Sequence, residues 1–141
     1  MKPTNKKVSL LRIVAATVYD SILMLGVWFL VGSIALGIKF VFTGEVSSLS
    51  PLTGMSLVIL STWLYFAVFW IYGGKTLGMS SWKLRIISHD GSQITIIQTI
   101  IRFLSNIITI SLAGIPLFFR RINKNNRSLS DFLSKTSIIS D

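Results

Sequence analysis

The sequence predicts an all-α integral membrane protein that forms a single domain over residues 1–141. Residues of the set AVILMFWYC make up 51% of the chain and Asp, Glu, Lys and Arg only 13%, whereas soluble domains average about 25% charged residues. Three long apolar segments, 13–38, 52–72 and 94–119, alternate with basic stretches. This composition argues against a soluble enzyme, and the high hydrophobicity excludes intrinsic disorder.

The first apolar segment, 13–38, holds 26 residues with one charge, Asp20. A spanning helix needs about 20 mostly apolar residues, so this segment predicts a firm transmembrane helix. The basic start of the chain and the small residues of Ser33-Ile34-Ala35 also resemble a cleaved signal peptide. We expect a retained anchor, because the apolar run exceeds the ~7–15 residues of a signal and contains an acid.

Asp20 lies eight residues after Arg12, which places it about 12 Å deeper at 1.5 Å per residue. The expected position is therefore close to the middle of a ~30 Å bilayer core. A carboxylate there costs about 2.5–3.5 kcal/mol unless it is paired, protonated or beside water. Two interpretations remain open: a structural ion pair or interhelical hydrogen bond, and a carboxylate that binds a proton or cation.

The second apolar segment, 52–72, has no charge and predicts a second firm transmembrane helix. Aromatic side chains crowd its end, as in the aromatic belt of a membrane boundary. The following loop predicts a small cytoplasmic β-hairpin, because Lys83–Ile86 alternates in polarity and Asp90-Gly91 is a strong turn signal before Gln93–Ile96.

The distribution of positive charge predicts the topology. The N-terminus, the second loop and the tail together hold 12 Lys and Arg, whereas the first loop holds 1. The positive-inside rule then puts the N-terminus, second loop and C-terminus on the cytoplasmic side of the membrane. The net charge of +9 is accordingly interpreted as contact with anionic lipid at the cytoplasmic face rather than as nucleic-acid binding.

The third apolar segment, 94–119, is expected to be a broken helix. With both flanks in the cytoplasm it does not cross once, and its 26 residues are too few for two crossings, which need about 40. Gly114-Ile115-Pro116 offers the break. We expect a re-entrant segment or a helix deep along the inner interface; a single crossing remains the alternative, with almost no charge bias between the two sides.

A polar stripe follows one helical face of this third segment, at spacings of three and four residues. Its members include the candidate site residues Gln98, Asn106 and Thr109, together with Thr95, Thr99, Arg102 and Ser105. Two interpretations stay open. The stripe lies in the lipid headgroups as the polar face of an interfacial helix, or it is buried against the other helices or a watery cavity.

The depth of the charged residues predicts two ion pairs. Arg102 lies eight residues after Ile94, as Asp20 lies eight after Arg12, so both reach a similar depth if the third segment descends steeply. We therefore expect Asp20 to pair with Arg102 inside the membrane and Arg12 to pair with Asp131 near the inner surface.

The side chains that enzymes use are scarce. The chain has no cysteine and a single histidine, His89, and it contains neither an HExxH motif nor paired glutamates. Thiolate chemistry, cysteine–zinc sites and intramembrane hydrolysis all need residues that this chain lacks. We expect no enzymatic activity, no metal and no cofactor.

Several motifs together resemble the RDD family of small membrane proteins, which is named for one Arg and two Asp. They are Arg12-Ile-Val-Ala-Ala-Thr-Val-Tyr-Asp20, Gly74-Lys75-Thr76-Leu77-Gly78-Met79, Lys83-Leu84-Arg85-Ile86 with Asp90-Gly91, and Asp131-Phe-Leu-Ser-Lys-Thr136. Their order and spacing cover nearly the whole chain. The resemblance assigns the family's signature to Arg12, Asp20 and Asp131. Met79 stands where the family usually has Lys or Arg, which weakens a role for charge there.

The resemblance implies a multi-pass protein of the bacterial inner (plasma) membrane, and transport of ions or small ligands is the usual suggestion for the family. We therefore expect a transporter or channel component in which Asp20 titrates, which needs a homo-oligomer or a larger membrane partner because three apolar segments cannot wall a pathway alone. The alternative is a non-transporting assembly or regulatory subunit, in which Arg12, Asp20 and Asp131 only hold the helices together.

Overall fold

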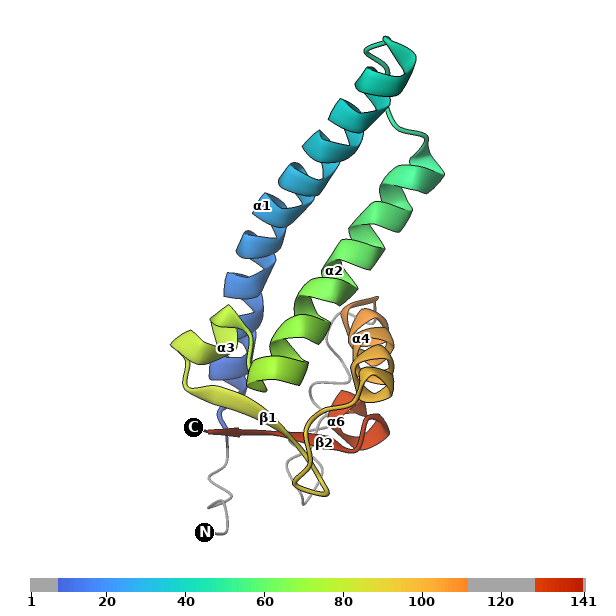
Figure 1. Cartoon of the computed structure of the whole chain (residues 1–141). Helices are drawn as coiled ribbons and strands as arrows, with labels where there is room; N and C mark the ends of the chain where they lie inside the picture. Colours follow the sequence, from blue (N-terminus) through green and yellow to red (C-terminus); the bar gives the residue numbers. More distant parts are fainter. Residues whose placement is uncertain (1–7, 112–128, 141) are drawn as a thin grey trace.

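Two long antiparallel helices dominate the computed structural model, which describes residues 8–111 and 129–140. Helix α1 spans Leu10–Thr43 and helix α2 spans Pro51–Gly73 (Figure 1). Both are long and apolar enough to cross a membrane, in agreement with the segments predicted at 13–38 and 52–72. The 34 residues of α1 extend for about 50 Å, well beyond the ~30 Å of a bilayer core.

Local signals in the sequence set the ends of these helices. Helix α1 ends at Gly44, whose left-handed φ of 68° lets its N–H donate to the carbonyl of Phe40. Helix α2 begins with Pro51 in its first turn, and the side chain of Ser50 accepts from the amide of Thr53. Gly74, with a left-handed φ of 65°, caps the C-terminus of α2 in the same way.

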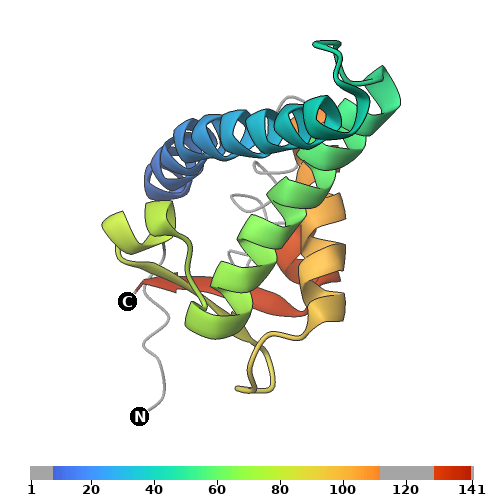
Figure 2. The same ribbon diagram turned by 45° about the horizontal axis from the view of Figure 1, so that its top comes forward.

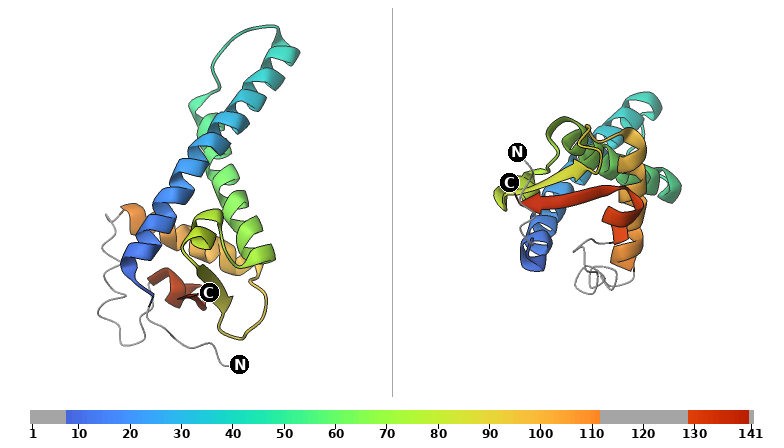
Figure 3. Two further views of the ribbon diagram at one scale, coloured as in Figure 1. Left: turned by 90° about the vertical axis from the view of Figure 1, so that its left-hand side faces the viewer. Right: turned by 90° about the horizontal axis from the view of Figure 1, so that it is seen from below.

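The two long helices cross each other and spread apart toward one end of the molecule (Figures 2 and 3). A hydrogen bond of 2.9 Å from Trp28 Nε1 to Thr62 Oγ1 joins them. Because the helices run antiparallel, this contact fixes which residues lie level with one another. Asp20, eight residues before Trp28, lies level with the last turn of α2.

All the remaining described elements gather at the end where α1 begins and α2 ends (Figure 1). They are the short helix α3 (Leu77–Ser81), strand β1 (Leu84–Ser88), helix α4 (Ile96–Ser111), the short helix α6 (Leu129–Leu133) and strand β2 (Thr136–Ser140). The start of α1, the 74–95 segment and the end of β2 therefore share one side of the molecule, opposite the 44–50 loop.

The two strands form an antiparallel pair in which Leu84 faces Ser140 and Ser88 faces Thr136 (Figure 3). The strand predicted at 83–86 is present, but its predicted partner, Gln93–Ile96, is wrong. Those residues lead into α4, whose first residue is Ile96. The predicted turn is present, since Gly91 has φ 69°, but the chain continues from it into α4 instead of a second strand. The strand that pairs with β1 is β2, in which Thr136, 48 residues after Ser88, is the partner of Ser88.

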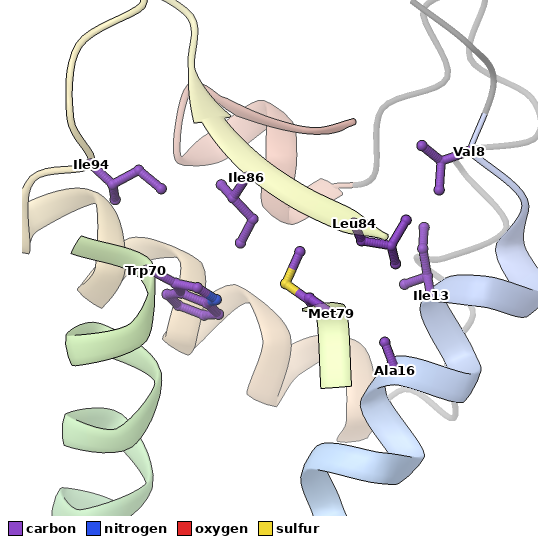
Figure 4. Packing of buried hydrophobic residues seen from close by; sticks show 8 residues of the cluster. All are labelled: Val8, Ile13, Ala16, Trp70, Met79, Leu84, Ile86 and Ile94. Carbon is purple, nitrogen blue, oxygen red and sulfur yellow. The ribbon is translucent and has the colours of Figure 1, made fainter. Parts of the chain in front are cut away.

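The apolar core lies at this end of the molecule, not along the long helices. Its members come from α1, α2, α3, β1 and the segments that precede α1 and α4 (Figure 4): Val8, Ile13, Ala16, Trp70, Met79, Leu84, Ile86 and Ile94. Elsewhere α1 and α2 expose large apolar side chains, such as Phe29 and Val41, both 79% exposed. Long helices with such surfaces suit lipid as their surroundings, whereas the core at the end resembles that of a soluble protein.

Helix α4 lies across the long helices and carries its polar stripe inward (Figure 3). Thr99 and Arg102 are 0% and 3% exposed, whereas Ile97 and Leu104 on the other face are 70% and 54% exposed. Most of the stripe is thus buried or half-buried against neighbouring elements, whereas Thr95 at its start is exposed. The predicted break at Gly114-Ile115-Pro116, and all of 112–119, lies outside the described residues.

Candidate functional site

Asp20 is buried, and its carboxylate accepts three hydrogen bonds from three different parts of the chain. Oδ2 accepts from the hydroxyl of Thr76. Oδ1 accepts from the backbone amide of Gly78 at 2.9 Å and from the hydroxyl of Tyr65 at 3.2 Å. The carboxylate therefore joins α1 to α2, to the loop after α2 and to α3.

The loop after α2 is shaped to present these donors. The side chain of Thr76 begins α3 by accepting from the amide of Met79 at 3.1 Å, while its own hydroxyl proton goes to Asp20. The amide of Gly78 belongs to the first turn of α3, where no intrahelical acceptor exists. Asp20 thus supplies from another helix the acceptor that a helix N-terminus needs, and its negative charge suits that end of the helix.

Gly78 is required because α3 approaches α1 very closely. A Cβ atom at this position would lie 2.8 Å from both Cγ and Oδ2 of Asp20, and it would also collide with the carbonyl oxygen of Ala16. The latter is a backbone atom of α1 and has no freedom to move away. Only glycine permits the amide of residue 78 to reach the carboxylate.

These contacts change the expected depth of Asp20. The prediction counted inward from Arg12 and reached the middle of the bilayer core. The structure instead joins Asp20 to Thr76 and Gly78, which follow the end of α2 at Gly73. The carboxylate is therefore level with the end of the second long helix, because the first turns of α1 extend past that end and pack against α3 and β1.

A second buried polar cluster holds the C-terminal segment. Arg102 Nη1 lies 2.8 Å from Asp131 Oδ1, and both side chains are almost fully buried. The same nitrogen donates to Thr136 Oγ1 at 2.6 Å, and the hydroxyls of Thr136 and Ser134 are 2.7 Å apart. The guanidinium also lies over the ring of Trp70, 5.5 Å from its centroid. Helix α4 is thereby bound to α6, β2 and α2.

Both predicted ion pairs are wrong. Arg102 pairs with Asp131, whereas Asp20 is held by neutral donors, and Arg12 is exposed on the first turn of α1. The prediction assumed that the third segment descends into the membrane beside α1. Because α4 instead lies across the molecule (Figure 3), Arg102 faces α6, and the signature residues Arg12, Asp20 and Asp131 do not form one site.

The other candidates on the polar stripe serve local structure or line a cavity. Gln98 donates to Ser88 Oγ at 3.3 Å and accepts from the amide of Thr95 at 3.0 Å. Thr109 donates to the carbonyl of Ser105 within α4. Asn106 is half-buried and lines a cavity that lies beside α4.

A cavity of about 460 Å³ lies among α1, α2, α4 and the sheet. Asp20 and Arg102 both contribute to its wall, but most of the lining is apolar, with Ile59, Phe66 and Phe103 among its residues. Within the described ranges, no group of three His, Cys, Asp or Glu side chains comes together to hold a metal ion. The chemistry offered by the wall is therefore apolar contact with a few polar groups.

Reasoning from the sequence missed the partners of both buried acids. Thr76 and Gly78 belong to the motif Gly74–Met79, but nothing in that motif indicates that they face Asp20. Tyr65 was hidden in an uncharged helix, and Thr136 follows Asp131 by only five residues. One signal in the sequence could have predicted the contacts of Asp20 with Thr76 and Gly78. It is the combination of a carboxylate in an apolar helix with a Thr-x-Gly helix start on the same side of the membrane.

Replacing Gly78 by Ala should lower the free energy of unfolding by about 1–3 kcal/mol, as for other overpacked sites. The reason is the collision with Ala16 and Asp20. Gly73→Ala is the matched control, because a Cβ at Gly73 meets nothing within 4 Å and should leave stability unchanged or slightly raised. Thermal and denaturant unfolding in detergent micelles would measure both; equal stability of the two variants would contradict the close approach of α3.

Replacing Asp131 by Ala should cost about 3–5 kcal/mol, because it leaves the charge of Arg102 buried without its partner. The double variant Arg102→Met with Asp131→Leu should recover much of that loss, since a similar-sized apolar pair needs no compensating charge. Asp90→Ala, at an exposed turn, serves as the control. Unfolding experiments in micelles would contradict the pairing if the double variant were less stable than Asp131→Ala.

Comparison with known proteins supports one assignment. A model of the RDD family matches residues 9–135, a range that contains Arg12, Asp20 and Asp131. The searches of curated proteins and of solved structures found no match. With two long apolar helices and a family match over most of its length, this membrane protein belongs to the RDD family.

Proposed function

We propose that this protein is a non-transporting membrane module that acts as an assembly or regulatory subunit, without catalytic activity. The observation that carries the proposal is the state of the two buried acids. Asp20 accepts hydrogen bonds from Thr76, Gly78 and Tyr65, and Asp131 is paired with Arg102. Both carboxylates hold parts of the fold together, so neither is left open to take up and release a coupling ion.

The proposed topology has α1 and α2 crossing a bacterial inner membrane with the N-terminus in the cytoplasm. Two observations support it. The start of α1, α3, β1 and β2 lie at one end of the molecule, opposite the 44–50 loop (Figure 1). Among the described residues, that end carries Arg12, Lys75, Lys83, Arg85 and Lys135, whereas Lys39 is the one basic residue next to the loop. The same charges would contact anionic lipid headgroups.

Single-cysteine labelling tests this topology, because the chain has no cysteine of its own. Ser47→Cys, in the loop between the long helices, should react with a membrane-impermeant maleimide in intact spheroplasts. Ser92→Cys, in the turn before α4, should react only after permeabilisation. The reverse labelling pattern would contradict the proposed orientation.

A regulatory subunit needs a partner within the membrane, and α1 offers a surface for one. Ser33 and Gly37 are exposed and four residues apart, so they lie on one face of the helix and allow another helix to approach closely. A second copy of this chain and a larger membrane protein are both compatible with that surface.

A transporter or channel component is the second candidate, and the cavity is the observation that favours it. Asp20 and Arg102 both line this space, so a path that opened through it would pass a carboxylate. In that case the hydrogen bonds of Asp20 would have to break during each cycle.

Ion flux in proteoliposomes separates the two candidates. The non-transporting proposal predicts that wild-type protein gives no more proton or sodium flux than protein-free liposomes, and that Asp20→Asn lowers the thermal stability. Asp90→Asn, at an exposed position, is the matched control for stability. Flux above the protein-free level would contradict the proposal, and its loss in Asp20→Asn but not in Asp90→Asn would assign transport to the carboxylate.

A further inference from the structure

Helix α4 has its polarity reversed relative to a helix on the surface of a soluble protein. Thr99, Arg102 and Ser105 are buried under other elements, whereas large aliphatic side chains cover the opposite face. The exposed side chains of α4 are Ile96, Ile97, Ile100, Leu104, Ile107 and Ile108. A soluble helix turns its apolar side to the core and its polar side to water. The exposed face of α4 therefore suits surroundings other than water.

Four of these side chains form a continuous row along the helix. Ile97, Ile100, Leu104 and Ile108 follow one another at spacings of three and four residues, so they lie on one side of α4. Arg102, the one charged residue of α4, lies on the other side and is buried beside Asp131. The row therefore offers no charge to a lipid headgroup or to an acidic protein surface, and an apolar medium suits it best.

The place of α4 in the fold puts this row beside the apolar surface of α2. The guanidinium of Arg102 lies over the ring of Trp70, one turn before the end of a helix that is long and apolar enough to cross a membrane. In Figure 1, α6 and β2 lie beyond α4, on the side away from the 44–50 loop. Because Arg102 contacts α6 and β2, the opposite row is turned away from them, toward the level at which α2 exposes Val68.

The direction of α4 keeps the row at one depth. The helix runs across α1 and α2 and not along them (Figure 3). Spanning helices run roughly along the bilayer normal, so a helix that lies across them runs close to the membrane plane. The 16 residues of α4 extend for about 24 Å, which is also short of a ~30 Å bilayer core. Helix α4 thus fits within a single leaflet.

We propose that α4 lies in the plane of one leaflet and that Ile97, Ile100, Leu104 and Ile108 contact the acyl chains of bilayer lipids. The proposed topology makes this the cytoplasmic leaflet. The inference goes beyond the proposed function, because a lipid-embedded α4 is compatible with a transporting and with a non-transporting protein. Cysteine labelling that reversed the topology would move α4 to the other leaflet and leave it embedded, so the two proposals fail separately.

Spin labels on single cysteines test the proposal in the full-length protein, reconstituted into phosphatidylcholine liposomes. Leu104→Cys reports on the middle of the row, Val68→Cys on the exposed face of α2, and Ser92→Cys on the exposed turn before α4. Electron paramagnetic resonance measures how often each label collides with O2, which concentrates in hydrocarbon, and with a polar nickel chelate, which stays in water. We expect the label at position 104 to match the one at 68, with an O2-to-nickel collision ratio several-fold above that of the label at 92.

Two results for the label at position 104 would overturn the proposal. Nickel accessibility equal to that of the label at 92 would mean that the row faces water. Low accessibility to both O2 and nickel would mean that protein covers the row, and magnetic coupling between the labels of two chains would identify that cover as a second copy.

Labels at the two ends of the row test the direction of α4. Ile97→Cys and Ile108→Cys are eleven residues apart, which corresponds to about 16 Å along a helix axis. Both positions are exposed, so the labelled variants should unfold at the wild-type temperature. We expect the two collision ratios to report similar depths, differing by less than half of that length. A difference close to the full length would show that α4 descends through the bilayer, and would overturn its placement in one leaflet.

Discussion

The hydrogen bonds of the Asp20 carboxylate are the interaction on which the rest of the structure depends. Removing a carboxylate from water is costly, and hydrogen bonds to a charged group restore about 1.5–3 kcal/mol each. Thr76 and Gly78 provide two of them from the short helix that follows α2, and Tyr65 provides the third from α2 itself. The absence of a side chain at Gly78 is what allows the two segments to come this close.

The position of α3 determines where the later segments lie. Strand β1 begins at Leu84, three residues after the end of α3 at Ser81, so fixing α3 against α1 also fixes β1. Strand β2 then pairs with β1 and brings Thr136 within reach of Arg102. The Asp131–Arg102 pair completes the arrangement by tying α6 to α4. The two signature acids thus stabilise different parts of the fold: Asp20 holds α3 against α1, and Asp131 holds α6 against α4.

The sequence predicted the features that depend on composition and failed on those that depend on long-range geometry. The two long helices follow from uncharged segments of sufficient length, and family membership followed from the order of motifs. The partners of Asp20 and Arg102 could not be predicted, because depth was counted on the assumption that the third segment runs parallel to α1. The partner of β1 was missed for a related reason: Asp90-Gly91 favours a local hairpin, and nothing near it indicates a strand at Thr136–Ser140.

A double-mutant cycle between Asp20→Asn and Thr76→Val tests the central claim most directly. Unfolding free energies of wild type, both single variants and the double variant give the coupling energy between the two side chains. If the carboxylate and the hydroxyl hold α3 against α1, the coupling should be at least about 1 kcal/mol. A parallel cycle of Asp20→Asn with Thr62→Val, whose hydroxyl accepts from Trp28, should be close to additive. Additive behaviour in the Asp20–Thr76 cycle would contradict the account.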